Sequence, residues 1–205
     1  MHVSAVQKDP KTYEHINPNE IGNARNIVVS DQSGQSNIMS RLNAIGIIIE
    51  KDDPKIKKLL HEVKDREFIG YSYDGADASF ELLARRLMGE IPRYISINEY
   101  DVSVKKDSAG EVISFAKAKL EVDGHQILCE GKGNGPVNAL DNAIRKNVNK
   151  LEKYSEYLKD LKLVDYKVRI LNTGTGAVTR VSIESADSKH GNWFTIGVSP
   201  NIIDA

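Results

Sequence analysis

The chain of 205 residues is long enough for one ample domain or two small ones, and its composition, 40% hydrophobic and 28% charged, is ordinary for a globular protein. A formal net charge of -1 gives no general attraction to nucleic acid or acidic lipid. The single cysteine, Cys129, excludes an internal disulfide framework. The sequence has no apolar run of membrane-spanning length and no signal-peptide pattern, so we expect a cytoplasmic chain with no membrane partner.

Residues 1–36 have weak periodicity and many turn-forming residues, which predicts an extended, loop-rich segment. His2, Tyr13 and His15 stand there among acidic residues. The two histidines are too far apart to share a helical turn, and no third histidine lies nearby. We therefore predict no metal site in this segment.

Three short amphipathic helices are expected next. The first is capped by Ser36 and ends at Gly46, and the second begins after Asp53. Asp74 or Asp77 is expected to cap the third, before its apolar positions. The first two helices form the second part of a small linker region, which we place at residues 1–65, and the domain changes between about Asp65 and Gly75.

From Tyr94 the apolar period changes from helical to alternating, which is typical of strands. Residues 112–122 predict a long strand, Asp123 and Gly124 a hairpin turn, and residues 127–129 a third strand that leads into a helix. Together these elements form a unit of three strands and one helix.

The same order of elements returns further along the chain. Tyr166 follows Tyr100, and Pro200 follows Pro136, at nearly the same interval, which indicates an internal duplication. The second copy stops where its helix should begin, so we interpret it as truncated there. The predicted fold is therefore α+β: two βββα units within residues 66–205, preceded by the small helical linker region.

The link between the third strand and the helix carries three glycines, Gly131, Gly133 and Gly135, followed by Pro136. The glycines permit positive φ, and proline suits a first helical position. Unpaired amides in a first helical turn, together with the helix dipole, can bind a phosphate or a carboxylate. Alternatively, the glycines serve only to let the helix pack closely on its strands, and the sequence alone favours this second interpretation.

Four motifs together resemble the C-terminal part of enzymes of the 2-isopropylmalate synthase family, of the citramalate synthase type. The motifs are residues 73–83, 131–143, 163–169 and 197–205. The resemblance covers essentially the whole chain. It implies that residues 1–65 are linker subdomains and that residues 66–205 are an allosteric dimerisation domain, so the chain is expected to form a homodimer.

The resemblance also implies an activity for a longer parent enzyme. Such an enzyme condenses acetyl-CoA with a 2-oxo acid, pyruvate in the citramalate case, in a barrel that holds a divalent metal, and is inhibited by a branched-chain amino acid. The barrel is absent from this sequence, so we expect no cofactor here and no activity from the chain alone. By the resemblance, His2 and Tyr13 are linker residues that reach the partner's active site and contribute to catalysis.

An amino-acid effector needs donors for its carboxylate, an acceptor for its ammonium and an apolar pocket for its side chain. Backbone amides in the glycine-rich link suit the carboxylate, either of two aspartates suits the ammonium, and apolar residues of both units suit the side chain. The expected effector-binding residues are Gly133, Asn134, Gly135, Pro136, Val137, Leu140, Asp141, Asp165, Tyr166, Val181 and Ile196. Isoleucine and leucine differ only in a branch position, worth about 1 to 3 kcal/mol in such a pocket, so the sequence does not choose between them.

Three other functions were weighed. A 2-isopropylmalate synthase regulatory region would bind leucine, and a bare dimerisation module would bind no ligand. Three strands followed by a glycine-rich link and a helix also resemble the end of a double-stranded-RNA-binding domain. That module needs lysines in the first helical turn, and residues 136–141 contain none, so we expect no nucleic-acid partner.

Overall fold

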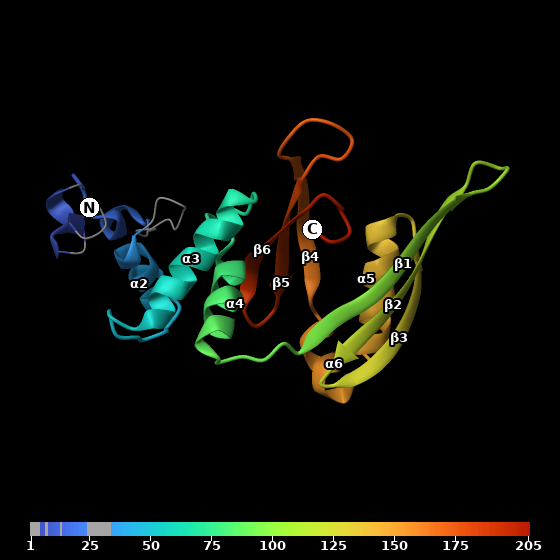
Figure 1. Ribbon diagram of the computed structural model, residues 1–205, viewed down its shortest axis with the longest axis horizontal. Coiled ribbons are helices and arrows are strands. Elements are labelled where there is room, and N and C mark those ends of the chain that lie inside the picture. The colour runs from blue at the N-terminus through green and yellow to red at the C-terminus, as the bar shows by residue number, and fades with distance from the viewer. Residues whose placement is uncertain (1–4, 7, 13, 24–33) are drawn as a thin grey trace.

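The computed structural model describes residues 5, 6, 8–12, 14–23 and 34–205. Within these residues a helical region precedes two antiparallel sheets of three strands each (Figure 1). This arrangement confirms the predicted α+β class. His2 and Tyr13, the predicted linker residues of the active site, lie outside the described residues. No helix in the described ranges is long and apolar enough to cross a bilayer.

The helical region packs around one apolar core. Its elements are η1 (Pro10–Thr12), η2 (Pro18–Ile21), α2 (Gln35–Ala44), α3 (Pro54–Phe68) and α4 (Asp77–Met88). Ile38, Ile56 and Phe80, one from each α-helix, are fully buried there, as their helical spacing predicts. The helices bury their apolar faces against one another, and the loop before α4 adds the buried ring of Tyr73.

The ends of these helices follow the sequence only in part. Asp53 caps α3 as predicted, since its side chain accepts from the Lys55 N–H at 2.8 Å. Ser36, in contrast, lies inside α2, whose N-cap is Gly34. Asp77 is the first residue of α4 rather than its cap, and its carboxylate pairs with the largely buried Arg41. The predicted cap at Ser36 is therefore wrong, and so are both alternatives for α4, Asp74 and Asp77, because the N-cap of α4 is Ala76 and Asp77 pairs with Arg41 instead.

The first sheet, sheet A, has the strand order β1-β2-β3, and one face is covered by a helix. Its elements are β1 (Ile95–Lys106), β2 (Val112–Val122), β3 (His125–Gly133), α5 (Pro136–Val148) and the short α6 (Glu152–Leu158). Alternate residues of β2 from Ser114 to Val122 are buried, as predicted. Asp123 and Gly124 both have positive φ, which a tight two-residue hairpin requires.

The second sheet, sheet B, repeats the first. Its strands are β4 (Lys162–Ile170), β5 (Thr179–Asp187) and β6 (Gly191–Ser199), in the order β4-β5-β6. The pairing register shifts between Ile97 and Glu99 in the first unit and between Leu163 and Asp165 in the second. A bulge at the equivalent place in both leading strands confirms the duplication.

The two units differ in what covers them. Helix α5 lies on one face of sheet A, whereas residues 201–204 after β6 form a turn (Figure 1). Sheet B is instead flanked by α4, which lies beside β6. There the N–H of Ile196 donates to the Ser79 hydroxyl at 2.9 Å, and Arg180 Nε donates to the Gly70 carbonyl at 2.6 Å. Both the edge strand β6 and the central strand β5 of sheet B are therefore hydrogen-bonded to the helical region.

Candidate functional site

The glycine-rich link between β3 and α5 is built for close packing. A Cβ on Gly131 would lie 2.5 Å from the Ala143 nitrogen, and one on Gly133 would lie 2.5 Å from the Ala139 nitrogen. Neither glycine has positive φ, and Gly135 is extended with φ −157°. The interpretation that these glycines supply positive φ is wrong, and the alternative that the sequence favoured, close packing of the helix on its strands, is confirmed.

The first turn of α5 is tied to β3 through asparagine side chains. Pro136 occupies the first helical position as predicted, and no side chain caps the helix. Asn138 Oδ1 accepts from the Asn134 N–H at 3.3 Å, and Asn142 Nδ2 donates to the Lys132 carbonyl at 2.9 Å. The link is thereby ordered before any ligand binds.

A buried hydroxyl lies at this end of sheet A. Ser114 on β2 pairs with Gly133 on β3, and its side chain is fully buried. Its Oγ has no hydrogen-bond partner within the described residues. Burying an unpaired hydroxyl costs about 1–3 kcal/mol. The Ser114 hydroxyl is therefore a polar group beside the glycine-rich link that can still form a hydrogen bond.

The two aspartates considered for the effector's ammonium already carry cations. Asp141 accepts two bonds from Arg145 Nε, at 2.8 and 2.9 Å, one turn along α5. Asp165 pairs with Lys167 Nζ at 2.6 Å, and the hydrogen bond from Lys167 lowers the pKa of this carboxyl. To bind either aspartate, an effector's ammonium would have to displace the arginine or lysine from an ion pair at the surface.

The register of sheet B divides the predicted apolar residues between two faces. Tyr166 pairs with Ile183, and Val168 with Val181, so Tyr166 and Val181 share one face. Ile196 pairs with Ser182 and therefore lies on the opposite face. Burial raises the pKa of Tyr166 and leaves only 2% of Val181 exposed. Gly197 pairs with Val181 and shares this face, and a Cβ there would meet Ala205, so the residues after β6 lie against the face that carries Tyr166 and Val181.

That turn brings the second copy of the motif against the first unit. The Tyr100 hydroxyl on β1 donates to Asp204 Oδ1 at 2.7 Å, and Asn201 Nδ2 donates to the same hydroxyl at 3.3 Å. Ile203 packs against the core of sheet A, which includes Leu140. The start of α5 and residues 201–204 therefore pack at the same core. They follow the third strand of their respective units, so they occupy matching positions in the duplication.

Sequence reasoning did not assign Tyr100, Ile203 or Asp204 to the site. The hydrogen bond with Asp204 raises the pKa of Tyr100, so it is a specific contact between the two units. A signal was available, since Asn201 and Asp204 repeat the spacing of Asn138 and Asp141.

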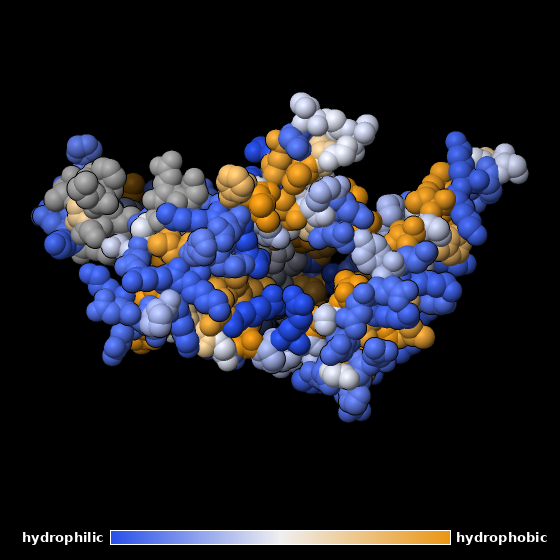
Figure 2. Space-filling model, in the orientation of Figure 1, coloured by the Kyte–Doolittle hydropathy of each residue, from blue (hydrophilic) through white to orange (hydrophobic). Residues whose placement is uncertain are grey.

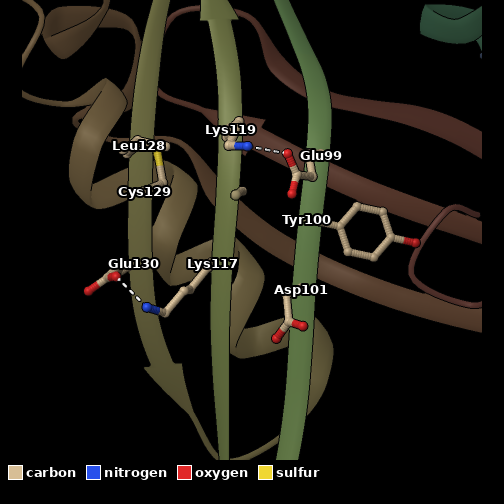
Figure 3. Close-up of a pocket in the computed structure, with 9 residues that line it drawn as sticks. Glu99, Tyr100, Asp101, Lys117, Lys119, Leu128, Cys129 and Glu130 are labelled. Atoms are coloured by element: carbon tan, nitrogen blue, oxygen red, sulfur yellow. Dashed lines mark hydrogen bonds and ion pairs between the residues drawn. The ribbon is translucent and has the colours of Figure 1, made fainter.

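Sheet A also has a shallow pocket of about 270 Å³ on the face away from α5 (Figure 3). Charged side chains from the three strands line it, and they pair with one another: Lys117 with Glu130 at 2.9 Å, and Lys119 with Glu99. The Tyr100 ring points away from this group, toward the turn after β6 (Figure 3). Because its charges are paired, this face offers little to an anionic or zwitterionic ligand.

Metal and thiol chemistry find no support in the part of the chain that the structure describes. It contains no group of three or more histidine, cysteine, aspartate or glutamate side chains that could hold a metal ion. The Cys129 thiol is buried in the core of sheet A, and burial raises its pKa. The thiol therefore packs as an apolar group.

Two known protein families match parts of this chain. Residues 74–205 match the LeuA allosteric (dimerisation) domain, which covers both sheets and α5. The chain belongs to this family. Residues 1–68 match a second family, the homocitrate synthase post-HMGL domain-like family.

Three curated relatives are similar to this chain over its whole length. It is 45% identical to an (R)-citramalate synthase of Aquifex aeolicus and 43% identical to that of Geobacter sulfurreducens, each over 100% of this chain and 39% of the relative. A relative from Synechocystis with the same name is 43% identical over 100% of this chain and 38% of the relative. The chain thus spans about 39% of the length of the relatives it matches.

Proposed function

We propose that this chain is the regulatory region of an acyltransferase of the citramalate synthase type, and that it dimerises and binds a branched-chain amino acid. The names of the relatives and of the matched family support this function. In this proposal residues 1–65 are linker subdomains and residues 66–205 the regulatory domain.

The observation that carries the effector site is the meeting of the two duplicated motifs at the core of sheet A. The effector's carboxylate lies at the first turn of α5, where backbone amides are uncapped by any side chain. Its apolar chain packs beside Val137, which is 36% exposed, and Leu140. Its ammonium binds Asp204, whose carboxylate is held in place by Tyr100, or displaces the cation from Asp141 or Asp165.

Dimerisation is supported by apolar surface left on sheet B. Val168 and Ile170 of β4 are 43% and 67% exposed and share a face with Tyr166. Figure 2 shows hydrophobic residues gathered over the upper part of this sheet. A contiguous apolar surface of this kind is typical of a protein interface.

The parent reaction belongs to a longer protein. We propose that a barrel outside this sequence holds the divalent metal and condenses acetyl-CoA with pyruvate, and that His2 and Tyr13 reach the active site of the partner. The chain alone then lacks the metal-binding barrel and is inactive. Loss of turnover in full-length His2→Ala, with effector binding retained, tests the proposed linker role.

Calorimetric titration of the chain with isoleucine, leucine and a duplex RNA tests the proposed function. We expect saturable binding of one amino acid and none of RNA. Val137→Asp should weaken that binding at least tenfold, because the new carboxylate repels the effector's carboxylate. The same substitution should not destabilise α5, since a negative charge is favourable in the first turn of a helix. Val137→Thr, a matched neutral control, should retain affinity within about threefold. Binding unchanged in Val137→Asp would contradict this site, and binding of neither amino acid would favour a ligand-free dimerisation module.

A further inference from the structure

A second pocket lies at the junction between the helical region and sheet B, away from the proposed effector site. Its volume is about 460 Å³. Residues of α3, α4 and β6 line it, and Figure 1 shows α4 beside β6 at this place. Leu82, Leu83 and Leu87 of α4 and Ile196 of β6 give it apolar walls. The hydrogen bond from Ile196 to the Ser79 hydroxyl joins the two walls.

Three arginines line the same pocket, and two of them lack a counter-ion. Arg66 Nε is held by Glu62 at 2.7 Å, and its guanidinium lies over the Tyr71 ring. Arg86 and Arg93 are exposed and form no ion pair with any residue that the structure describes. Neighbouring Arg85, in contrast, is paired with both Glu81 and Glu90. The pocket therefore carries two uncompensated positive charges.

This combination of charge and apolar wall selects a class of ligand. Guanidinium groups bind carboxylates and phosphates through charge-assisted hydrogen bonds. An inorganic phosphate would satisfy the charges and leave the leucine wall exposed, while a monocarboxylate would leave one arginine unpaired. We propose that this pocket binds a small dicarboxylate with a short apolar backbone. One carboxylate binds Arg86, the other binds Arg93, and the backbone packs against Leu82 and Leu87.

Binding there has a consequence for the junction. Besides its contacts with α4 and the loop after it, the proposed ligand lies against Thr195 and Ile196 of β6, so it stabilises the contact between the helical region and sheet B. Because Trp193, the single tryptophan, lies on β6 two positions before Thr195 of the pocket, its fluorescence should report occupancy. The proposal is independent of the amino-acid effector, whose proposed site lies at α5.

The experiment titrates the chain with methylsuccinate, using calorimetry and Trp193 fluorescence. We expect saturation with a Kd of about 1 mM or tighter. Arg86→Gln and Arg93→Gln should each raise that Kd about tenfold. Arg169→Gln removes an exposed arginine of β4 outside the pocket and should leave the Kd unchanged. Circular dichroism of each variant confirms that it is folded.

Several results would overturn the proposal. These are the absence of saturation at about 20 mM, far above the expected Kd, equal binding of inorganic phosphate or isovalerate, and equal weakening in Arg169→Gln. Isoleucine titrated on the same variants separates the two sites: its affinity should not change in Arg86→Gln. Loss of methylsuccinate binding with retained isoleucine binding in that variant supports a distinct dicarboxylate site.

Discussion

The two duplicated units have the same strand pattern and differ in their cover. In sheet A, α5 lies against the inner face, and Ala116, Ala118, Leu120 and Val122 of β2 are at most 4% exposed. In sheet B the equivalent face has only the turn at 201–204: Val181 of the central strand β5 is 2% exposed, but Val168 and Ile170 of the edge strand β4 are 43% and 67% exposed. The alternating pattern therefore specifies a strand in both units, while burial depends on the element packed against it.

The largest expected effect comes from Gly133→Val. A Cβ there meets the backbone of α5 at 2.5 Å, which a flexible side chain cannot relieve. We expect a loss of about 3 kcal/mol or more in the free energy of unfolding, measured by urea denaturation. Gly135→Ala is the matched control, since nothing lies within 4 Å of its Cβ position.

The same substitution in the second unit sharpens the comparison. A Cβ on Gly197 would clash only with Ala205, at the end of a short turn that can move away. Gly197→Val should therefore cost less than about 1 kcal/mol. Equal costs at Gly133 and Gly197 would contradict the view that α5 makes the first unit the more tightly packed.

A second comparison uses core truncation. Leu120 is fully buried beneath α5, so Leu120→Ala should cost about 2–5 kcal/mol. Ile183 of sheet B shares a face with Val181 but is only half-buried, and Ile183→Ala should cost about half as much, since its site is already partly hydrated. Chemical denaturation of both variants gives the ratio, and a ratio near one would show that sheet B is covered in solution, as by a partner.

Local features of the chain were predictable, because they depend on neighbouring residues. The alternation of β2, the Asp123-Gly124 turn and Pro136 at the start of α5 follow from side-chain period and from preferred φ values. The duplication was predictable from repeated spacing, and with it the fold class.

The arrangement of the candidate site was not predictable in the same way. The sequence allowed Gly133 either an unusual φ or a close approach to the helix, and the distance to α5, a tertiary contact, decides for the close approach. The division of Tyr166 and Ile196 between two faces depends on strand register, and the Tyr100–Asp204 contact joins residues 104 apart in the chain. No local pattern fixes such contacts.

Removing one oxygen atom should weaken the contact between the two units. Tyr100→Phe removes the hydroxyl that donates to Asp204 and accepts from Asn201. We expect a loss of about 0.5–1.5 kcal/mol in the free energy of unfolding and faster amide exchange in residues 201–205. Unchanged exchange there would show that Ile203, rather than this hydroxyl, holds the turn against sheet A.

The smallest effect concerns pH and is tested in the first unit. Asp123 in the β2–β3 turn accepts from Lys153 Nζ at 2.7 Å and from the Tyr154 hydroxyl at 2.9 Å, which lowers the pKa of its carboxyl. A carboxyl whose pKa is lower in the folded state stabilises the fold above its unfolded pKa, near about 4, and loses that contribution as pH falls through the folded value.

Asp123→Asn keeps a residue that tolerates the positive φ of this turn and removes the charge. Between about pH 5 and pH 3, the melting temperature of the variant should fall less steeply than that of the unmodified chain, while the two converge at the acidic end. Because Asp123 is exposed, the difference should also shrink in high salt. Parallel melting curves across this range would mean that the ion pair with Lys153 contributes no net stability, and that α6 is held to the turn by the Tyr154 ring and its neighbours in the core of sheet A.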